Sequence, residues 1–232
     1  MRAAETTRSQ DDAQPRRNDA PLSGWGGARN RAILGADEMT AGVKIRMAGV
    51  GDAAAIADIY RPFVTDAVTS FEVTPPGAAE MARRIEAVLA LAPWLVALDD
   101  AGAPIGYAYA SRHAERAAYQ WSVDTTVYIR KGHHRRGVGR ALYGELFPLL
   151  RLQGFYVAHA GVTLPNPASV GLHESLGFRP VGVYPAVGWK LGAWRDVGWW
   201  QLPLQQRPAT PAPPLSLAEA QRLPSWPAAL RF

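Results

Sequence analysis

The chain has 232 residues, a formal charge of +5 and no cysteine, and 48% of its residues are hydrophobic. This composition is typical of a folded domain, and it excludes a disulfide framework, a thiolate metal site and a cysteine-bound acyl intermediate. It also fits a reducing compartment. The longest apolar run, residues 87–98, is interrupted by Pro93 and is shorter than the about 20 residues of a membrane-spanning helix. We therefore expect neither a membrane segment nor a secretory signal.

Both ends of the chain lack the periodicity of a folded core. Residues 1–43 contain as many acidic as basic residues, and we expect a disordered extension in which Met39 is an alternative start. Residues 205–232 are rich in proline, and we expect a tail without core-forming residues and with at most a short helix over 217–222. The folded domain is accordingly expected over residues 44–204.

Within this domain, amphipathic segments alternate with short β-branched ones. In the first half we expect a strand at 43–47, a helix capped by Asp52, a helix at 78–91, and a hairpin of strands 94–98 and 105–111. In the second half we expect a strand at 118–129, a helix at 139–153, a strand at 157–163, a helix at 167–176, and strands at 178–189 and 197–204. This order predicts a mixed α/β domain with antiparallel strands first and a β-α-β-α unit later.

The most informative stretch is a β-branched strand that runs into a basic, glycine-bearing turn and a helix, residues 127–140. Glycines let a ligand approach the backbone, and the free N–H groups of a helix start attract an anion. The segment is neither a Walker A loop nor a dinucleotide-binding fingerprint. A solvent-exposed basic helix start is the alternative, but cations there oppose the helix dipole. The compact cluster therefore predicts a pyrophosphate ligand, and not a nucleic-acid surface.

Two separate motifs make the pattern more specific. Residues 135–139, Arg-Arg-Gly-Val-Gly, resemble the acetyl-CoA pyrophosphate loop of the GCN5-related N-acetyltransferase (GNAT) superfamily, although His134 replaces the usual leading Gln or Arg. The block at 166–178 resembles the second motif of that superfamily. The resemblance implies a single GNAT domain, an α/β fold with a mixed, mostly antiparallel sheet flanked by helices, and acetyl-CoA as co-substrate without a metal.

Over residues 45–204 the chain most resembles the phosphinothricin and methionine sulfoximine N-acetyltransferase subfamily, with marks such as Pro93-Trp94-Leu95-Val96-Ala97 and residues 188–198. This resemblance implies acetylation of the amine of a small amino-acid-like substrate, in the cytoplasm, by a homodimer. The cofactor contacts that it implies are Val127, Tyr128, Ile129, Arg135, Arg136, Gly137, Val138, Gly139, Arg140 and Asn166.

The resemblance also implies two catalytic residues. Asp124, where the family usually has Glu, is the candidate general base, and His173 is the candidate second acid or base, because imidazole titrates near neutral pH. A strand carboxylate paired with an arginine and a histidine packed on a helix face are the respective alternatives. The expected substrate-binding residues are Arg116, Tyr119, Trp121, Thr163 and Lys190, with Trp194 as a further pocket residue.

Other functions stay open at this point. The acceptor is alternatively another amine, such as a polyamine, an aminoglycoside or a protein N-terminus, although the basic residues at 112–116 favour an anionic substrate. A catalytically silent CoA-binding regulator is a different class, and the presence of both Asp124 and His173 argues against it. We expect no nucleic-acid partner.

Overall fold

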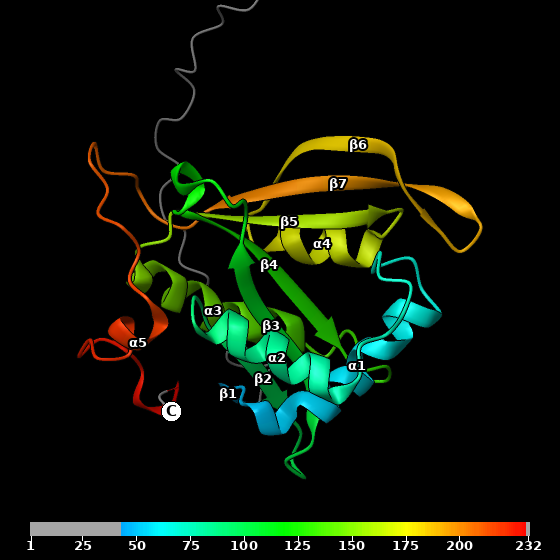
Figure 1. The fold of residues 1–232 in the computed structure, drawn as a ribbon, viewed down its shortest axis with the longest axis horizontal. Helices are drawn as coiled ribbons and strands as arrows, with labels where there is room; N and C mark the ends of the chain where they lie inside the picture. Colours follow the sequence, from blue (N-terminus) through cyan, green and yellow to red (C-terminus); the bar gives the residue numbers. More distant parts are fainter. Residues whose placement is uncertain (1–42, 231–232) are drawn as a thin grey trace, which may run out of the picture. The chain divides into compact units, whose positions relative to one another are not determined.

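The computed structural model describes residues 43–230, and the expected extension at 1–43 lies outside them except for Val43. One seven-stranded sheet has the order β1-β2-β3-β4-β5-β7-β6 (Figure 1). All neighbours are antiparallel except β4 and β5. The mixed, mostly antiparallel sheet is therefore confirmed. The strands are β1 (Lys44–Met47), β2 (Trp94–Leu98), β3 (Pro104–Arg112), β4 (Ser122–Ile129), β5 (Val157–Leu164), β6 (Arg179–Lys190) and β7 (Ala193–Pro203).

Helices cover both faces of this sheet. α1 (Ala53–Thr65) and α2 (Ala78–Leu89) pack on one face and form a core with Trp94 and Tyr107. α3 (Val138–Gln153) packs on the other face and forms the larger core, and α4 (Pro167–Ser175) lies against β5 behind the sheet in Figure 1. Because side chains alternate along a strand, neighbouring residues of β4 contact different helix layers.

Two local predictions are wrong. The strand expected at 118–129 begins only at Ser122, because a 3₁₀ turn, η2 (Ala117–Tyr119), precedes it. Asp52 stands before α1, but its side chain makes no cap to that helix. The carboxylate instead accepts hydrogen bonds from the Arg46 guanidinium at 2.7 Å and from the Gly49 N–H at 2.9 Å. It therefore ties β1 to the turn η1 (Val50–Asp52) that leads into α1.

The C-terminal segment packs on the domain, which contradicts the expectation of a tail without core-forming residues. Its helix α5 (Leu217–Ala220) lies within the expected 217–222, and η3 (Ala228–Leu230) follows. Leu217, Trp226 and Leu230 are each at most 3% exposed and belong to the α3-side core. The sequence did not predict this packing, because three buried apolar residues among many prolines are too few to show a helical or strand period.

Within residues 43–230 no helix is both long and apolar enough to cross a membrane.

Candidate active site

The site begins where two parallel strands separate. β4 and β5 are paired only from Ser122 to Asp124, against Val157 to His159, although both strands continue beyond that point. The far part of β4 therefore has a strand partner only on its β3 side. Backbone N–H and C=O groups on its open side are left to bond a ligand.

A cavity of about 790 Å³ occupies this gap. This volume suits a cofactor or a drug-sized molecule. The walls come from β4, β5, α3 and α4, with Phe63 and Thr69 from the α1 side. Among the expected cofactor and substrate residues, the cavity is lined by Val127, Tyr128, Ile129, Arg135, Gly137, Val138, Gly139, Arg140, Asn166 and Thr163.

The start of α3 forms one end of the cavity. Gly137 precedes the helix with a φ of 78°, a left-handed conformation that favours glycine. A Cβ on Gly139 would lie 3.1 Å from a Leu172 side-chain carbon, so α3 and α4 approach closely here. The first turn of α3 has no acidic residue, and its N–H groups face a cavity rimmed by Arg135 and Arg140. This arrangement suits a phosphate-bearing ligand.

Not every basic residue of the turn contributes equally. Arg136 is exposed and does not line the cavity, so its expected cofactor contact stays a prediction. Arg140 does line it and donates a hydrogen bond to Ser175 Oγ at 2.8 Å, which joins α3 to α4. His134, at the unusual leading position of the loop, donates through Nε2 to the Ile129 carbonyl at 2.8 Å. The Ile129 carbonyl therefore already accepts a hydrogen bond from a side chain of the protein.

His173 and Tyr143 form a pair inside the cavity wall. The Nδ1 atom of His173 lies 2.8 Å from the Ser169 carbonyl, which can only accept, so Nδ1 carries the proton. The lone pair of Nε2 then accepts from the Tyr143 hydroxyl at 3.2 Å. Burial lowers the pKa of His173 below its ordinary value and raises that of Tyr143. At neutral pH the pair is therefore an uncharged O–H donor and imidazole acceptor.

Asp124 lies at the point where β4 and β5 separate, on the opposite face of β4 from its neighbour Thr125. Its carboxylate Oδ1 is 2.6 Å from His113 Nδ1, and the His113 ring stacks on His159 with centroids 4.1 Å apart. Burial raises the pKa of Asp124, and the His113 contact opposes that shift. Asp124 itself does not line the cavity, whereas Thr125 and Thr126 do.

Three expected substrate residues lie outside the cavity. Arg116 and Tyr119 are exposed on the turn around η2, where Tyr119 contacts the His113 ring edge-on at 5.9 Å. Trp121 donates its indole N–H to the Ala212 carbonyl at 2.8 Å and so anchors the C-terminal segment. The turn therefore lies next to His113, which contacts Asp124, whereas Trp121 holds the C-terminal segment.

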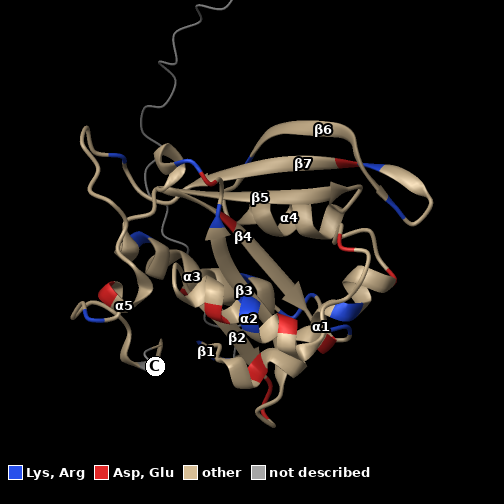
Figure 2. Ribbon diagram, viewed as in Figure 1, with Lys and Arg blue, Asp and Glu red and all other residues tan. Residues whose placement is uncertain are grey.

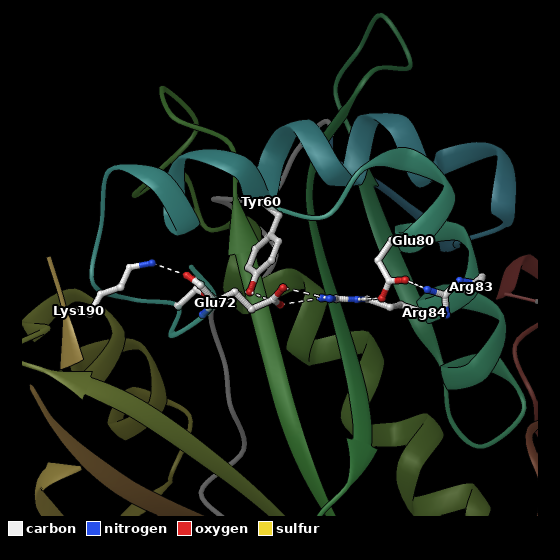
Figure 3. A network of polar contacts seen from close by, with 7 residues as sticks. Tyr60, Glu72, Glu80, Arg83, Arg84 and Lys190 are labelled. Atoms are coloured by element: carbon white, nitrogen blue, oxygen red, sulfur yellow. Dashed lines mark hydrogen bonds and ion pairs between the residues drawn. The ribbon is translucent and has the colours of Figure 1, made fainter. Parts of the chain in front are cut away.

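Lys190 is also outside the cavity, which does not fit the expected role as a substrate ligand. It is 4% exposed, and its Nζ donates to the main-chain carbonyls of Val64 and Glu72. Figure 3 shows the contact with Glu72. The Glu72 carboxylate accepts from Tyr60 at 2.8 Å and from Arg84 at 2.6 Å. Lys190 therefore ties the end of β6 to the last turn of α1 and to the loop between α1 and α2. Trp194, close by on β7, is 63% exposed.

Sequence reasoning missed four residues near this site. Tyr143 gave no signal, because it is one of several apolar residues on α3. Thr69 lines the cavity, and its Oγ1 is buried without a hydrogen-bond partner among the residues described. His113 and His159 lie 46 positions apart in sequence, and only the register of β4 with its neighbours brings both to Asp124. The one available signal was the small number of histidines, five in the whole chain.

Comparison with known proteins agrees with this geometry. Residues 55–178 match the model of the Acetyltransferase (GNAT) family. The chain is 39% identical to the phosphinothricin N-acetyltransferase of Streptomyces viridochromogenes over 73% of this chain and 94% of the relative. It is 34% identical to an L-methionine sulfoximine/L-methionine sulfone acetyltransferase of Pseudomonas aeruginosa, over 72% of this chain and 98% of that protein.

A solved structure leads to the same family. The phosphinothricin acetyltransferase of Sinorhizobium meliloti, determined in complex with AcCoA, superposes with a TM-score of 0.71 at 38% identity. The superposition covers 73% of this chain and 93% of that one. With the separated strands, the glycine-bearing helix start and these similarities together, the chain belongs to the GNAT family of acetyltransferases.

Proposed function

We propose that the protein transfers the acetyl group of acetyl-CoA to the amine of a small amino-acid-like substrate of the phosphinothricin or methionine sulfone type. The observation that carries this proposal is the separation of β4 from β5 over a cavity that ends at the Gly137 helix start. The named activities of the Streptomyces and Pseudomonas relatives support the substrate class.

The residues present fit acetyl-CoA. The α3 start and the side chains of Arg135 and Arg140 would hold its phosphates, and the open edge of β4 would pair with its amide-bearing arm. Asn166 accepts from the Ser169 N–H at 3.0 Å and fixes the α4 start beside the same cavity. When bound, the co-substrate supplies an acetyl group already activated as a thioester.

Two groups are placed to accept protons during the reaction: Asp124 on β4, and the Tyr143–His173 pair in the cavity wall. An ammonium substrate loses two protons during acetylation, and the leaving sulfur takes up one. We assign the first loss to Asp124, which acts through a water because its side chain does not line the cavity. The second passes through the Tyr143 hydroxyl to Nε2 of His173, since that hydrogen bond already directs a proton to the ring. The low pKa of His173 favours return of this proton to the sulfur.

The substrate would lie near the mouth of the cavity. Thr69 offers an unpartnered hydroxyl there, and Thr163 is a buried cavity-lining residue on β5. A substrate carboxylate or phosphinate needs cations, and Arg116 on the η2 turn is the candidate that the basic turn supplies. Attack by the amine is direct, within a ternary complex, because the chain has no cysteine to carry an acyl group.

We also propose that the protein acts as a homodimer in the cytoplasm, where acetyl-CoA is available. β6 is the edge strand of the sheet, and charged residues occur only at its two ends (Figure 2). Between those ends its exposed side chains are apolar, among them Val181 at 62%, Val183 at 51% and Tyr184 at 57%. A long, apolar, uncovered edge favours pairing with another chain.

The test measures thiol release and acetyl-CoA affinity in Asp124→Asn. General acid–base catalysis contributes about 10²–10⁴-fold, so we expect turnover to fall by that order while the dissociation constant for acetyl-CoA stays unchanged. Asp100→Asn, at an exposed turn carboxylate, is the matched control and should keep full turnover. Near-normal turnover in Asp124→Asn would remove Asp124 from the mechanism.

A further inference from the structure

Three side chains of the types that ligate metals meet beside the cavity, from segments far apart in the sequence. His113 follows β3, Asp124 lies on β4 and His159 lies on β5. One ring nitrogen of each histidine and one carboxylate oxygen of Asp124 all lie within 4.8 Å of one another. Among the described residues this is the one such group of three. We call these residues the His-Asp-His cluster.

The backbone fixes the cluster in place. Asp124 is directly opposite His159 in the parallel β4–β5 pair and opposite Ser111 on β3, two residues before His113. Side chains two apart on a strand share a face, so all three project to the same side of the sheet. The two imidazole rings are nearly parallel, with an interplanar angle of 19°. Strands β4 and β5 and the end of β3 therefore fix the backbone positions from which the three side chains project.

The donor set is that of a zinc site. Two imidazoles and one carboxylate bind Zn²⁺ with metal–ligand distances of about 2.0–2.2 Å, and a fourth position stays open for water. A tetrahedral ion at those distances needs ligand atoms about 3.3 Å apart. The lone pairs of stacked imidazoles lie in parallel planes, so binding needs the His113 and His159 rings to rotate out of their stack and the 2.6 Å contact between His113 and Asp124 to widen.

Two further observations point to a ligand. The Nδ1 atom of His159 is buried and makes no hydrogen bond of ordinary geometry among the described residues, although the Gln201 side chain and the Val123 backbone lie near the ring. The side chains of His113 and Asp124 are 26% and 29% exposed, which leaves a path for an ion from solvent. Among the ion pairs of the described residues, the Asp124 carboxylate has no lysine or arginine partner, and its one contact is with His113.

We propose that the His-Asp-His cluster binds one divalent transition-metal ion, with Zn²⁺ as the reference ion, and that this ion inhibits acetyl transfer. Binding follows from the donors alone. Inhibition rests on the proposed function, because a metal-bound carboxylate of Asp124 no longer accepts a proton from the amine. The chain has no cysteine, so a thiolate does not compete for the ion.

Zinc binding is measured on tag-free full-length protein by competition with a chromophoric zinc chelator, in the absence of CoA, whose thiol also binds zinc. We expect about one equivalent of zinc in the wild-type protein and its loss in both His159→Gln and His113→Gln. The control His133→Gln removes a histidine outside the cluster and should keep the full equivalent. Melting curves of the apo proteins verify that each variant is folded. Zinc should raise the melting temperature of the wild type and of His133→Gln, but not of His159→Gln or His113→Gln.

A second arm measures initial rates of acetyl transfer with and without zinc, followed by addition of a chelator. Zinc-dependent loss of rate in the wild type, reversed by the chelator, supports the inhibitory role. If zinc binds through the cluster but does not slow turnover, the inhibitory role and the role of Asp124 as base are both wrong. The metal site itself is then still supported. Absence of binding in the wild type, or binding that survives in the folded His159→Gln and His113→Gln variants, overturns the site itself.

Discussion

The C-terminal segment should be essential for stability, and Trp226→Ala tests this most sharply. Trp226 is 2% exposed within the α3-side core, and its indole N–H donates to the Leu230 carbonyl at 3.0 Å. Replacement of a buried tryptophan by alanine costs about 3–5 kcal/mol, because packing is lost and a cavity remains. Domains of ordinary size are stable by only about 5–15 kcal/mol, so this loss is a large share of the total.

Urea denaturation followed by circular dichroism gives the free energy of unfolding directly. We expect a lower midpoint with an unchanged slope, and a melting temperature lower by roughly 6–20 °C, at about 2–4 °C per kcal/mol for a chain of this size. Deletion of everything beyond Pro208 removes Leu217, Trp226 and Leu230 together and should leave an insoluble or unfolded domain.

The control is Arg222→Ala, a substitution at an exposed residue of the same segment, which should change the free energy of unfolding by less than about 0.5 kcal/mol. If Trp226→Ala also falls within that range, the segment does not stabilise the core in the way that its burial implies. A folded and fully active truncation at Pro208 would contradict the same reasoning independently.

Three other predictions concern the site and the assembly. Gly137→Val forces a β-branched residue to a φ of 78° and blocks backbone approach, so the dissociation constant for acetyl-CoA in calorimetry should rise about tenfold or more; unchanged affinity would remove this loop from the cofactor site. Because burial lowers the pKa of His173 below 6.5, the ring is neutral at pH 7 and the rate should decline only as the pH falls below 6.5; a profile that keeps this limb in His173→Gln would refute the assignment. Val183→Glu on β6 should yield monomers in light scattering, whereas Val73→Glu, at a valine 78% exposed outside β6, should not; an unchanged mass for both would place any dimer contact elsewhere.

The sequence carries most of the fold, because its elements are long and strongly patterned. The helix expected at 139–153 is observed from Val138 to Gln153, and the strand expected at 94–98 has those bounds. The cofactor site could also be located, since the glycine-bearing helix start is a local feature whose chemistry depends on neighbouring residues. Local signals of this kind are readable without tertiary information.

What the sequence could not give depends on contacts between distant residues. Trp226 looked like part of a proline-rich tail, because a single buried anchor produces no periodicity. Lys190 was expected to contact substrate. Its burial against two main-chain carbonyls depends on contacts between distant segments, so the sequence did not reveal it. Tyr143 acquires its relation to His173 through the packing of α3 against α4. Strand register, which sequence patterns specify poorly, produces the grouping of His113, Asp124 and His159.

The measurement that tests the central claim most directly is amine-dependent release of the CoA thiol from acetyl-CoA by the full-length protein. Acceptors are phosphinothricin, methionine sulfone and, as a contrast, a polyamine and an aminoglycoside. The account predicts saturable release with the amino-acid analogues, an N-acetylated product of the matching mass, and weak or no release with the polycations. Tight acetyl-CoA binding without release for any acceptor would contradict it, and would identify a CoA-binding protein that does not catalyse transfer.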